Sequence, residues 1–120
     1  MTENSILKPY DLEDRTFEFA KSTMGFCKEV GRSLVNGEVV RQLIRAAGSV
    51  GANFIEANES LSKKDFLMRV KICRKEAKES RYWLRLLDIE DGPVDIRRDE
   101  LMREAQELVK IFASIILKSK

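Results

Sequence analysis

Histidine is missing from this chain of 120 residues. Imidazole is the commonest general base and one of the commonest metal ligands in proteins. Without it, an active site would need carboxylate, lysine or cysteine chemistry, and no motif of that kind stands out in the sequence. We therefore expect no enzyme: no catalytic residue, no metal and no cofactor.

Three other features are scarce. The two prolines are Pro9 and Pro93, so most of the chain is free of helix breakers. Cys27 and Cys73 lie on apolar faces of separate helical patterns, which favours buried free thiols in a reducing cytosol over a disulfide. No segment approaches the roughly 18 apolar residues of a membrane span, and Met1–Lys8 lacks the apolar run of a secretory signal. We expect a cytoplasmic protein with no membrane role.

The pattern of apolar residues is helical along almost the whole chain. Four segments repeat them at alternating steps of three and four, which places them on one helix face. The expected helices span residues 11–34, 38–60, 63–90 and 96–118 of a single domain. No segment alternates with the period of a strand. Short turns between helices of similar length predict an all-α fold, an antiparallel up-down-up-down four-helix bundle.

Local signals set the expected helix ends. Asn36-Gly37 predicts a turn that ends the first helix. Ser62, with Asp65 three residues later, resembles a capping box at the start of the third helix. Gly92-Pro93 is expected to end that helix, and Asp95 to cap the fourth.

The third segment carries charge as well as a buried seam. From Lys63 to Arg85 there are nine Lys or Arg against three Asp or Glu, a balance of +6. From Leu86 to Glu107 eight acidic residues face three Arg, a balance of −5. The cations at helical spacing beside the seam are Lys64, Lys71, Arg74, Lys78, Arg81 and Arg85. Such a stripe predicts binding to the phosphates of RNA or DNA. A solvated helix face, neutralised by the acidic segment, is the competing interpretation.

The opposite flank of the same segment is apolar in places. Ile72, Trp83 and Leu86 lie away from the main seam, although a helix of an isolated bundle needs only one apolar face. We expect them to form an interface with another copy of the chain. Tyr82 and Trp83 are near the cations and could stack on bases, but packing is favoured for Trp83 because Ile72 and Leu86 share its flank.

Carboxylates and small residues give two further expectations. Asn53, Glu56, Glu76 and Glu79 are predicted to form a structural polar network rather than a di-metal site, since such sites use Glu-x-x-His. Gly48 and Gly51 interrupt the second helix, and close approach of a neighbouring helix explains them better than a phosphate-binding loop.

Several motifs in order resemble a known family. They are Tyr10–Ala20, Arg41–Arg45, Ser49–Ala57, Ser62–Phe66 and Lys75–Leu84. Together they resemble the bacterial four helix bundle proteins, also called 23S ribosomal RNA intervening-sequence proteins. The resemblance implies an antiparallel four-helix bundle that assembles into a ring-like homopentamer, with no biochemical activity established for the group. A related branch comprises basic accessory proteins of diversity-generating retroelements, which associate with a reverse transcriptase and nucleic acid. This chain is much less basic. The family signature falls on Ser49, Asn53, Glu56, Glu76, Glu79 and Trp83.

Two functions are compatible with these patterns. One is a non-enzymatic, oligomeric bundle that binds RNA or DNA through the cationic stripe. The other is a protein–protein interaction scaffold with no nucleic-acid role, whose stripe docks an acidic protein partner.

Overall fold

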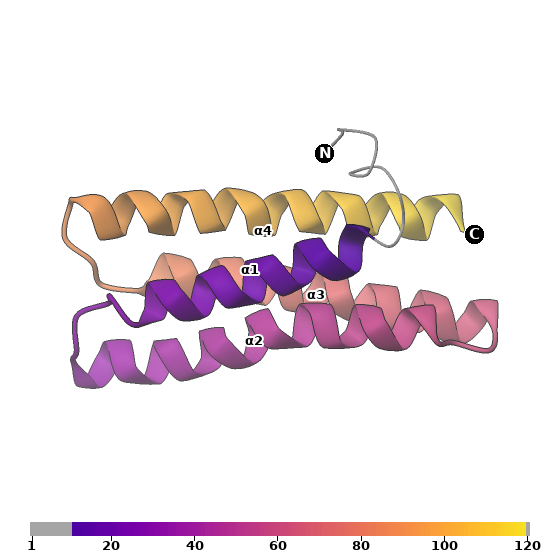
Figure 1. The fold of residues 1–120 in the computed structure, drawn as a ribbon, viewed down its shortest axis with the longest axis horizontal. Coiled ribbons are helices and arrows are strands. Elements are labelled where there is room, and N and C mark those ends of the chain that lie inside the picture. The colour runs from indigo at the N-terminus through magenta and orange to yellow at the C-terminus, as the bar shows by residue number, and fades with distance from the viewer. Residues whose placement is uncertain (1–10, 120) are drawn as a thin grey trace.

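The computed structural model describes residues 11–119, and this part of the chain folds into four α-helices with no strand (Figure 1). They are α1 (Asp11–Cys27), α2 (Leu34–Asn58), α3 (Lys63–Leu86) and α4 (Pro93–Lys118). The helices contact one another in a cycle, α1 with α2, α2 with α3, α3 with α4 and α4 with α1. The predicted all-α four-helix bundle is confirmed. Figure 1 also shows the three connections at alternating ends of the long axis.

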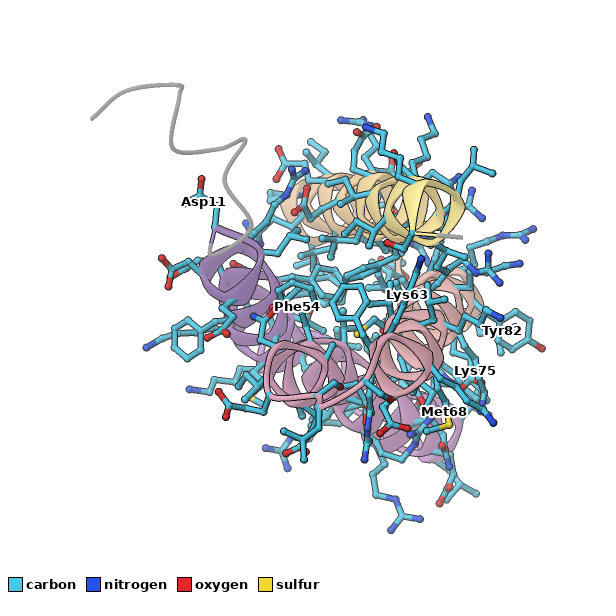
Figure 2. All side chains as sticks on the ribbon, turned by 90° about the vertical axis from the view of Figure 1, so that its right-hand side faces the viewer. Asp11, Phe54, Lys63, Met68, Lys75 and Tyr82 are labelled. Carbon is cyan, nitrogen blue, oxygen red and sulfur yellow. The ribbon has the colours of Figure 1, made fainter. Side chains whose placement is uncertain are left out.

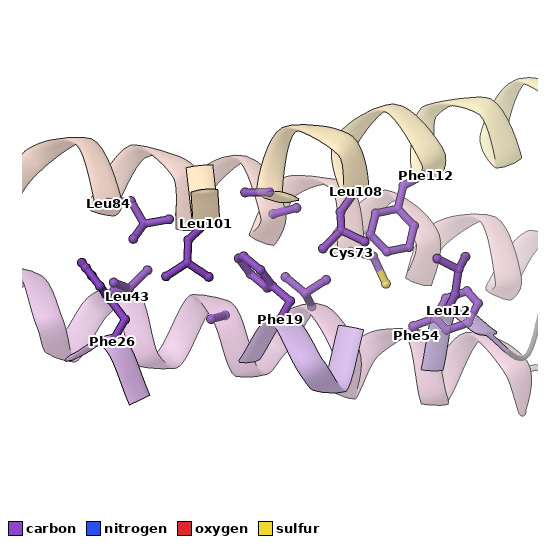
Figure 3. Close-up of a cluster of buried hydrophobic side chains, with 14 of the residues drawn as sticks. Leu12, Phe19, Phe26, Leu43, Phe54, Cys73, Leu84, Leu101, Leu108 and Phe112 are labelled. Atoms are coloured by element: carbon purple, nitrogen blue, oxygen red, sulfur yellow. The ribbon is translucent and has the colours of Figure 1, made fainter. Parts of the chain in front are cut away.

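The core contains one stripe from each helix, close to the predicted seams (Figure 3). Phe19, Leu43, Leu84 and Phe112 are among its largest fully buried side chains. Burial of an apolar side chain of this size contributes about 2 kcal/mol. The predicted apolar seam of the first helix is buried at all six positions, two of which are threonines. The six residues are Leu12, Thr16, Phe19, Thr23, Phe26 and Val30. Thr16 satisfies its hydroxyl by donating to the backbone oxygen of Leu12 at 2.7 Å.

The link between the first two helices differs from its prediction. α1 ends at Cys27 rather than near residue 34, and α2 begins at Leu34 rather than near residue 38. Asn36-Gly37 is therefore not a turn but part of the first turn of α2. The side chain of Ser33 caps that helix by accepting a hydrogen bond from the backbone N–H of Asn36 at 3.0 Å.

The link between the last two helices also differs. α3 ends at Leu86 rather than near residue 90, and α4 starts at Pro93 rather than at residue 96. Gly92 is not the end signal of α3 but the N-cap of α4, with a φ of 143° that favours glycine. Pro93 follows at the first helical position, where its missing N–H costs nothing. Asp95 lies inside the first turn, and Ser62 does cap α3 as predicted.

The two glycines of α2 have different surroundings. A Cβ atom on Gly51 would lie 3.0 Å from Oγ1 of Thr16, so α1 approaches α2 closely there. A Cβ on Gly48 would meet nothing within 4 Å. The expected close approach holds for Gly51 and fails for Gly48, where the side of the helix is open.

Two further expectations concern membrane spans and the N-terminal residues. Within residues 11–119, no helix is long and apolar enough to cross a membrane. Met1–Lys8, for which no secretory signal is expected, lies outside the described residues, as does Tyr10 of the family motif.

Candidate nucleic-acid interface

Helix α3 presents one exposed ridge between the two helices that flank it. Its buried residues face the core, while α2 and α4 pack against its two sides. The side chains that remain most exposed follow the remaining face at steps of three and four. We call them the outer face of α3: Lys64, Met68, Lys71, Lys75, Lys78, Tyr82 and Arg85. In Figure 2, Met68, Lys75 and Tyr82 point away from the bundle on the same side.

The outer face overlaps the predicted cationic stripe only in part. Four of the six predicted residues lie on it and are exposed: Lys64, Lys71, Lys78 and Arg85. Arg74 and Arg81 are half-buried, because they lie one position nearer to α4. Lys75 was missed by the sequence argument, which followed the stripe next to the core. The signal was present, since Lys64, Lys71, Lys78 and Arg85 repeat every seven residues, and Lys75 lies between them.

The cations of the outer face are not neutralised by the rest of the described chain. Within residues 11–119, the six predicted cations form no ion pair and no side-chain hydrogen bond, and the same holds for Lys75. Two acidic residues of α4 have partners other than these cations. Glu104 pairs with Arg15 of α1 at 2.7 Å, and Asp95 pairs with Arg98 at 2.6 Å.

The position of the acidic residues on α4 explains why. Glu104 faces α1, and Arg98 faces α3, where it reaches the backbone of Leu84 and Leu87. Positions about one, two and three turns after Arg98 lie on the same side of the helix. They carry Met102, Gln106 and Val109, none of which is acidic. From Met102 onward, the flank of α4 that borders α3 therefore has no carboxylate to attract the stripe; Asp95 and Asp99 lie on this flank only near the start of the helix.

The predicted polar network is divided in two by the structure. Arg45 of α2 donates to Glu76 at 3.3 Å and to Glu79 at 3.0 Å. Further along, Arg69 donates to the side-chain oxygen of Asn53 at 3.0 Å. Glu56 does not join either group: it is exposed, and its carboxylate has no partner within residues 11–119. These contacts join α2 to α3 and leave no shared carboxylate cluster. In the described residues no group of His, Cys, Asp or Glu is arranged to hold a metal ion.

The three residues predicted for a subunit interface are partly covered by the bundle itself. Ile72 and Trp83 are half-buried, and Leu86 is 44% exposed. Trp83 packs against the core, and its indole N–H is buried without a partner among the described residues. Its ring meets that of Tyr82 in a T-shaped contact with centroids 5.1 Å apart.

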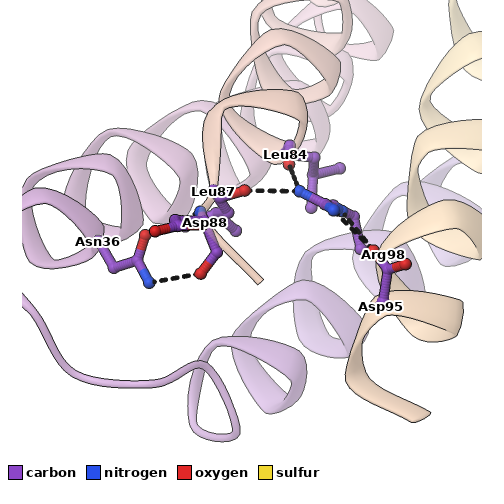
Figure 4. Close-up of polar contacts among 6 residues, drawn as sticks. All are labelled: Asn36, Leu84, Leu87, Asp88, Asp95 and Arg98. Carbon is purple, nitrogen blue, oxygen red and sulfur yellow. Dashed lines mark hydrogen bonds and ion pairs between the residues drawn. The ribbon is translucent and has the colours of Figure 1, made fainter. Parts of the chain in front are cut away.

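The end of α3 is anchored by two side chains that sequence reasoning missed (Figure 4). Asn36 of α2 donates to the backbone oxygen of Asp88 and accepts from its N–H, both at 3.0 Å. Arg98 of α4 donates to the oxygens of Leu87 at 2.7 Å and Leu84 at 3.3 Å. These bonds satisfy carbonyl groups that a helix end leaves free. No sequence motif marks them, because the partners are backbone atoms.

Neither thiol nor the seam between α1 and α4 forms a reactive site. Burial raises the pKa of Cys27 to about 11 and that of Cys73 to about 12, so both stay protonated at neutral pH. A groove of about 400 Å³ separates α1 from α4, with Phe19 and Leu101 in its lining. Arg15 of α1 also lines this groove and is already paired with Glu104. That hydrogen bond raises the pKa of the Arg15 guanidinium above its ordinary value.

Four packed helices with an exposed cationic ridge define the chain as a small all-α bundle protein. The sequence profile of the 23S rRNA-intervening sequence proteins matches residues 10–114, and the chain belongs to that family. A crystal structure from Bacteroides thetaiotaomicron VPI-5482, of a protein of unknown function from the S23 ribosomal protein family, is similar to it. The two chains share 31% identity with a TM-score of 0.76, over 92% of this chain and 98% of the other. No curated protein sequence matches the chain.

Proposed function

We propose that this protein is a non-enzymatic, oligomeric helical bundle that binds RNA or DNA through the outer face of α3. The observation that carries the proposal is the row of exposed cations without an acidic partner in the described chain. Lysine and arginine on such a row bind phosphates by releasing counterions. The half-buried Arg74 and Arg81 extend the positive surface toward α4. The name of the family, which refers to an intervening sequence of 23S rRNA, supports RNA as the ligand.

The arrangement within the oligomer is part of the proposal. Alternating connections at the two ends of the long axis favour the antiparallel up-down-up-down order. Ile72, Trp83 and Leu86 lie beside the outer face on the α2 side of α3 and would contact another copy. The family resemblance implies a ring of five. Size-exclusion chromatography with light scattering tests this, and a monomer of 13.8 kDa would contradict self-association.

A cytoplasmic location is also proposed. Both cysteines are free thiols, which persist in a reducing compartment. Burial on the apolar side of α1 and α3 explains their presence without any role in chemistry.

Charge reversal on the outer face tests nucleic-acid binding. The variant Lys71→Glu/Lys78→Glu should weaken binding of a labelled RNA, measured by fluorescence anisotropy, for all sequences alike. The matched control is Lys21→Glu/Lys28→Glu, which changes the net charge equally. Lys21 belongs to α1, which does not contact α3, and Lys28 follows directly after α1. The control should bind nearly as well as the unmodified chain.

Salt provides the second measure. Five phosphate contacts on a single strand give a slope that lowers affinity about a hundredfold between 50 and 200 mM salt. Absence of binding at 50 mM salt, or equal weakening by both double variants, would contradict the proposal. A scaffold that docks an acidic protein partner would then be the better explanation of the ridge.

A further inference from the structure

We propose that the outer face of α3 binds RNA in its unpaired, single-stranded form, and that Tyr82 stacks on an exposed base. This inference rests on the nucleic-acid binding proposed above and adds the structural class of the ligand. Its starting point is the composition of the ridge, which is not purely cationic. Tyr82 stands among the cations and is 52% exposed.

The placement of Tyr82 suits a stacking residue. Lys78 precedes it by one helical turn and Arg85 follows it by nearly one turn, so both lie beside the ring on the same face. A base stacked on the ring would leave its flanking phosphates within reach of these cations. Binding of this kind combines a positive track for the backbone with an aromatic platform for the bases.

Trp83 is the support rather than the platform. Its ring is half-buried against the core, so it cannot receive a base. The T-shaped contact at 5.1 Å holds Tyr82 against it. A ring that is already restrained loses less rotational freedom on binding than a free one. The contact with Trp83 therefore restricts the orientation of the exposed ring.

The exposed ring of Tyr82 favours an unpaired strand over a duplex. Lys64 and Arg85 are about 31 Å apart along a helix with a rise of 1.5 Å per residue. At the 3.4 Å rise of a stacked strand this length covers about nine nucleotides, and fewer of an extended strand. In a duplex the bases are stacked on one another and unavailable to Tyr82. Unpaired bases are abundant in RNA loops, bulges and ends, which are the usual targets of aromatic recognition. We therefore assign the ligand to RNA.

The chain contains a matched control for the aromatic residue. Phe17 of α1 is 58% exposed, and Lys21 lies over its ring with Nζ 5.7 Å from the centroid. It is thus an exposed aromatic side chain beside a lysine, on a helix that does not contact α3. Phe17→Ala removes the same kind of surface from a different face of the molecule.

The experiment compares a single strand of about ten nucleotides with the duplex of the same sequence, at 50 mM salt. The unmodified chain should bind the single strand at least about tenfold more tightly than the duplex. Tyr82→Ala should weaken single-strand binding about tenfold and leave duplex binding unchanged. Tyr82→Phe and Phe17→Ala should bind like the unmodified chain. Circular dichroism verifies that each variant keeps its helices.

The outcomes separate the two proposals. Equal, salt-dependent binding of both ligands, with Tyr82→Ala no weaker than Phe17→Ala, would overturn the stacking inference and keep the nucleic-acid function. No binding of either ligand would overturn both. Ultraviolet crosslinking in cells that express the chain identifies the source of the ligand: adducts removed by RNase support the assignment, and adducts removed only by DNase overturn it.

Discussion

The two sides of α3 handle charge in opposite ways. On the side that faces α2 and at its C-terminal end, charged groups are paired or anchor backbone: Glu76 binds Arg45 of α2, and Arg98 of α4 binds the last carbonyls of the helix. On the outer face, Lys71, Lys75 and Lys78 point into solvent without partners in the described chain. The helix is the same, so the difference comes from what packs beside it.

This contrast separates two uses of positive charge in one protein. Arg45 and Arg98 belong to the fold, because removing either one leaves polar groups without partners. Lysines on the outer face contribute little to folding, and closely spaced like charges at three and four residues even oppose it. Cations that oppose folding and have no partner in the described chain are what the proposed binding surface requires.

Removing Arg98 should have the largest effect on stability. Arg98→Ala loses the bonds to Asp95, Leu84 and Leu87 and leaves two carbonyl oxygens at the end of α3 without their donor. We expect the free energy of unfolding, measured by urea denaturation, to fall by about 2–3 kcal/mol. Arg85→Ala on the outer face is the control and should change it by less than about 0.5 kcal/mol. Equal losses would erase the distinction between the two sides.

Alkaline pH should lower the stability of the protein through the buried side of α3, where Cys73 lies. Lys71 and Lys75 flank Cys73 in sequence, yet burial raises the pKa of this thiol to about 12 from an ordinary value of 9.0. The unfolded chain therefore loses the thiol proton at lower pH than the folded one. The contribution of Cys73 to stability is fully present below pH 9.0 and is lost as the pH rises toward 12.

The expected loss is roughly 1 kcal/mol per pH unit in that window. Urea denaturation at pH 7 and above pH 9 measures it, with Cys73→Ala as the comparison because it lacks the thiol. The variant should show a shallower pH dependence than the unmodified chain. The same dependence in both would mean that the thiol titrates as if exposed.

Reversing one charge on the outer face should have the smallest effect on stability, and of opposite sign. In Lys71→Glu the new carboxylate lies three and four residues before Arg74 and Lys75, which favours ion pairs along the helix. We expect the protein to gain about 0.5 kcal/mol of stability while its affinity for RNA falls. The gain should shrink in 1 M salt, where the Debye length is about 3 Å. A loss of stability would show that Lys71 has a structural role.

Much of the core was predictable from periodicity. The seams of α1 and α3 match the buried residues almost completely, since steps of three and four define one side of a helix whatever its neighbours are. The prediction was less accurate where two adjacent residues compete for the core. The pattern predicts Val40 and Ile115 on the seams, but Val39 and Ile116 are buried instead, while Val40 and Ile115 are half-buried. These choices depend on the rotation of each helix against its partners.

The helix ends were less predictable, because distant residues decide them. Asn36-Gly37 is a turn signal on local grounds. In the folded chain the amide of Asn36 binds the backbone of Gly31 and of Asp88, and the segment joins α2. Similarly, α3 ends at Leu86, and Arg98 of α4 donates a hydrogen bond to the backbone oxygen of Leu87 there. Contacts across more than ten residues of sequence leave no local signature.

By itself, the sequence determined the helical class, the core stripes and the excess of positive charge on the third helix, because hydrophobic periodicity and charge are local properties. Only the tertiary structure decided which cations are accessible. The packing of α2 and α4 against α3 half-buries Arg74 and Arg81, exposes Lys75, and places Tyr82 on the ridge with Trp83 behind it. A helical stripe tells which residues share a face, but exposure depends on the neighbours that cover its edges.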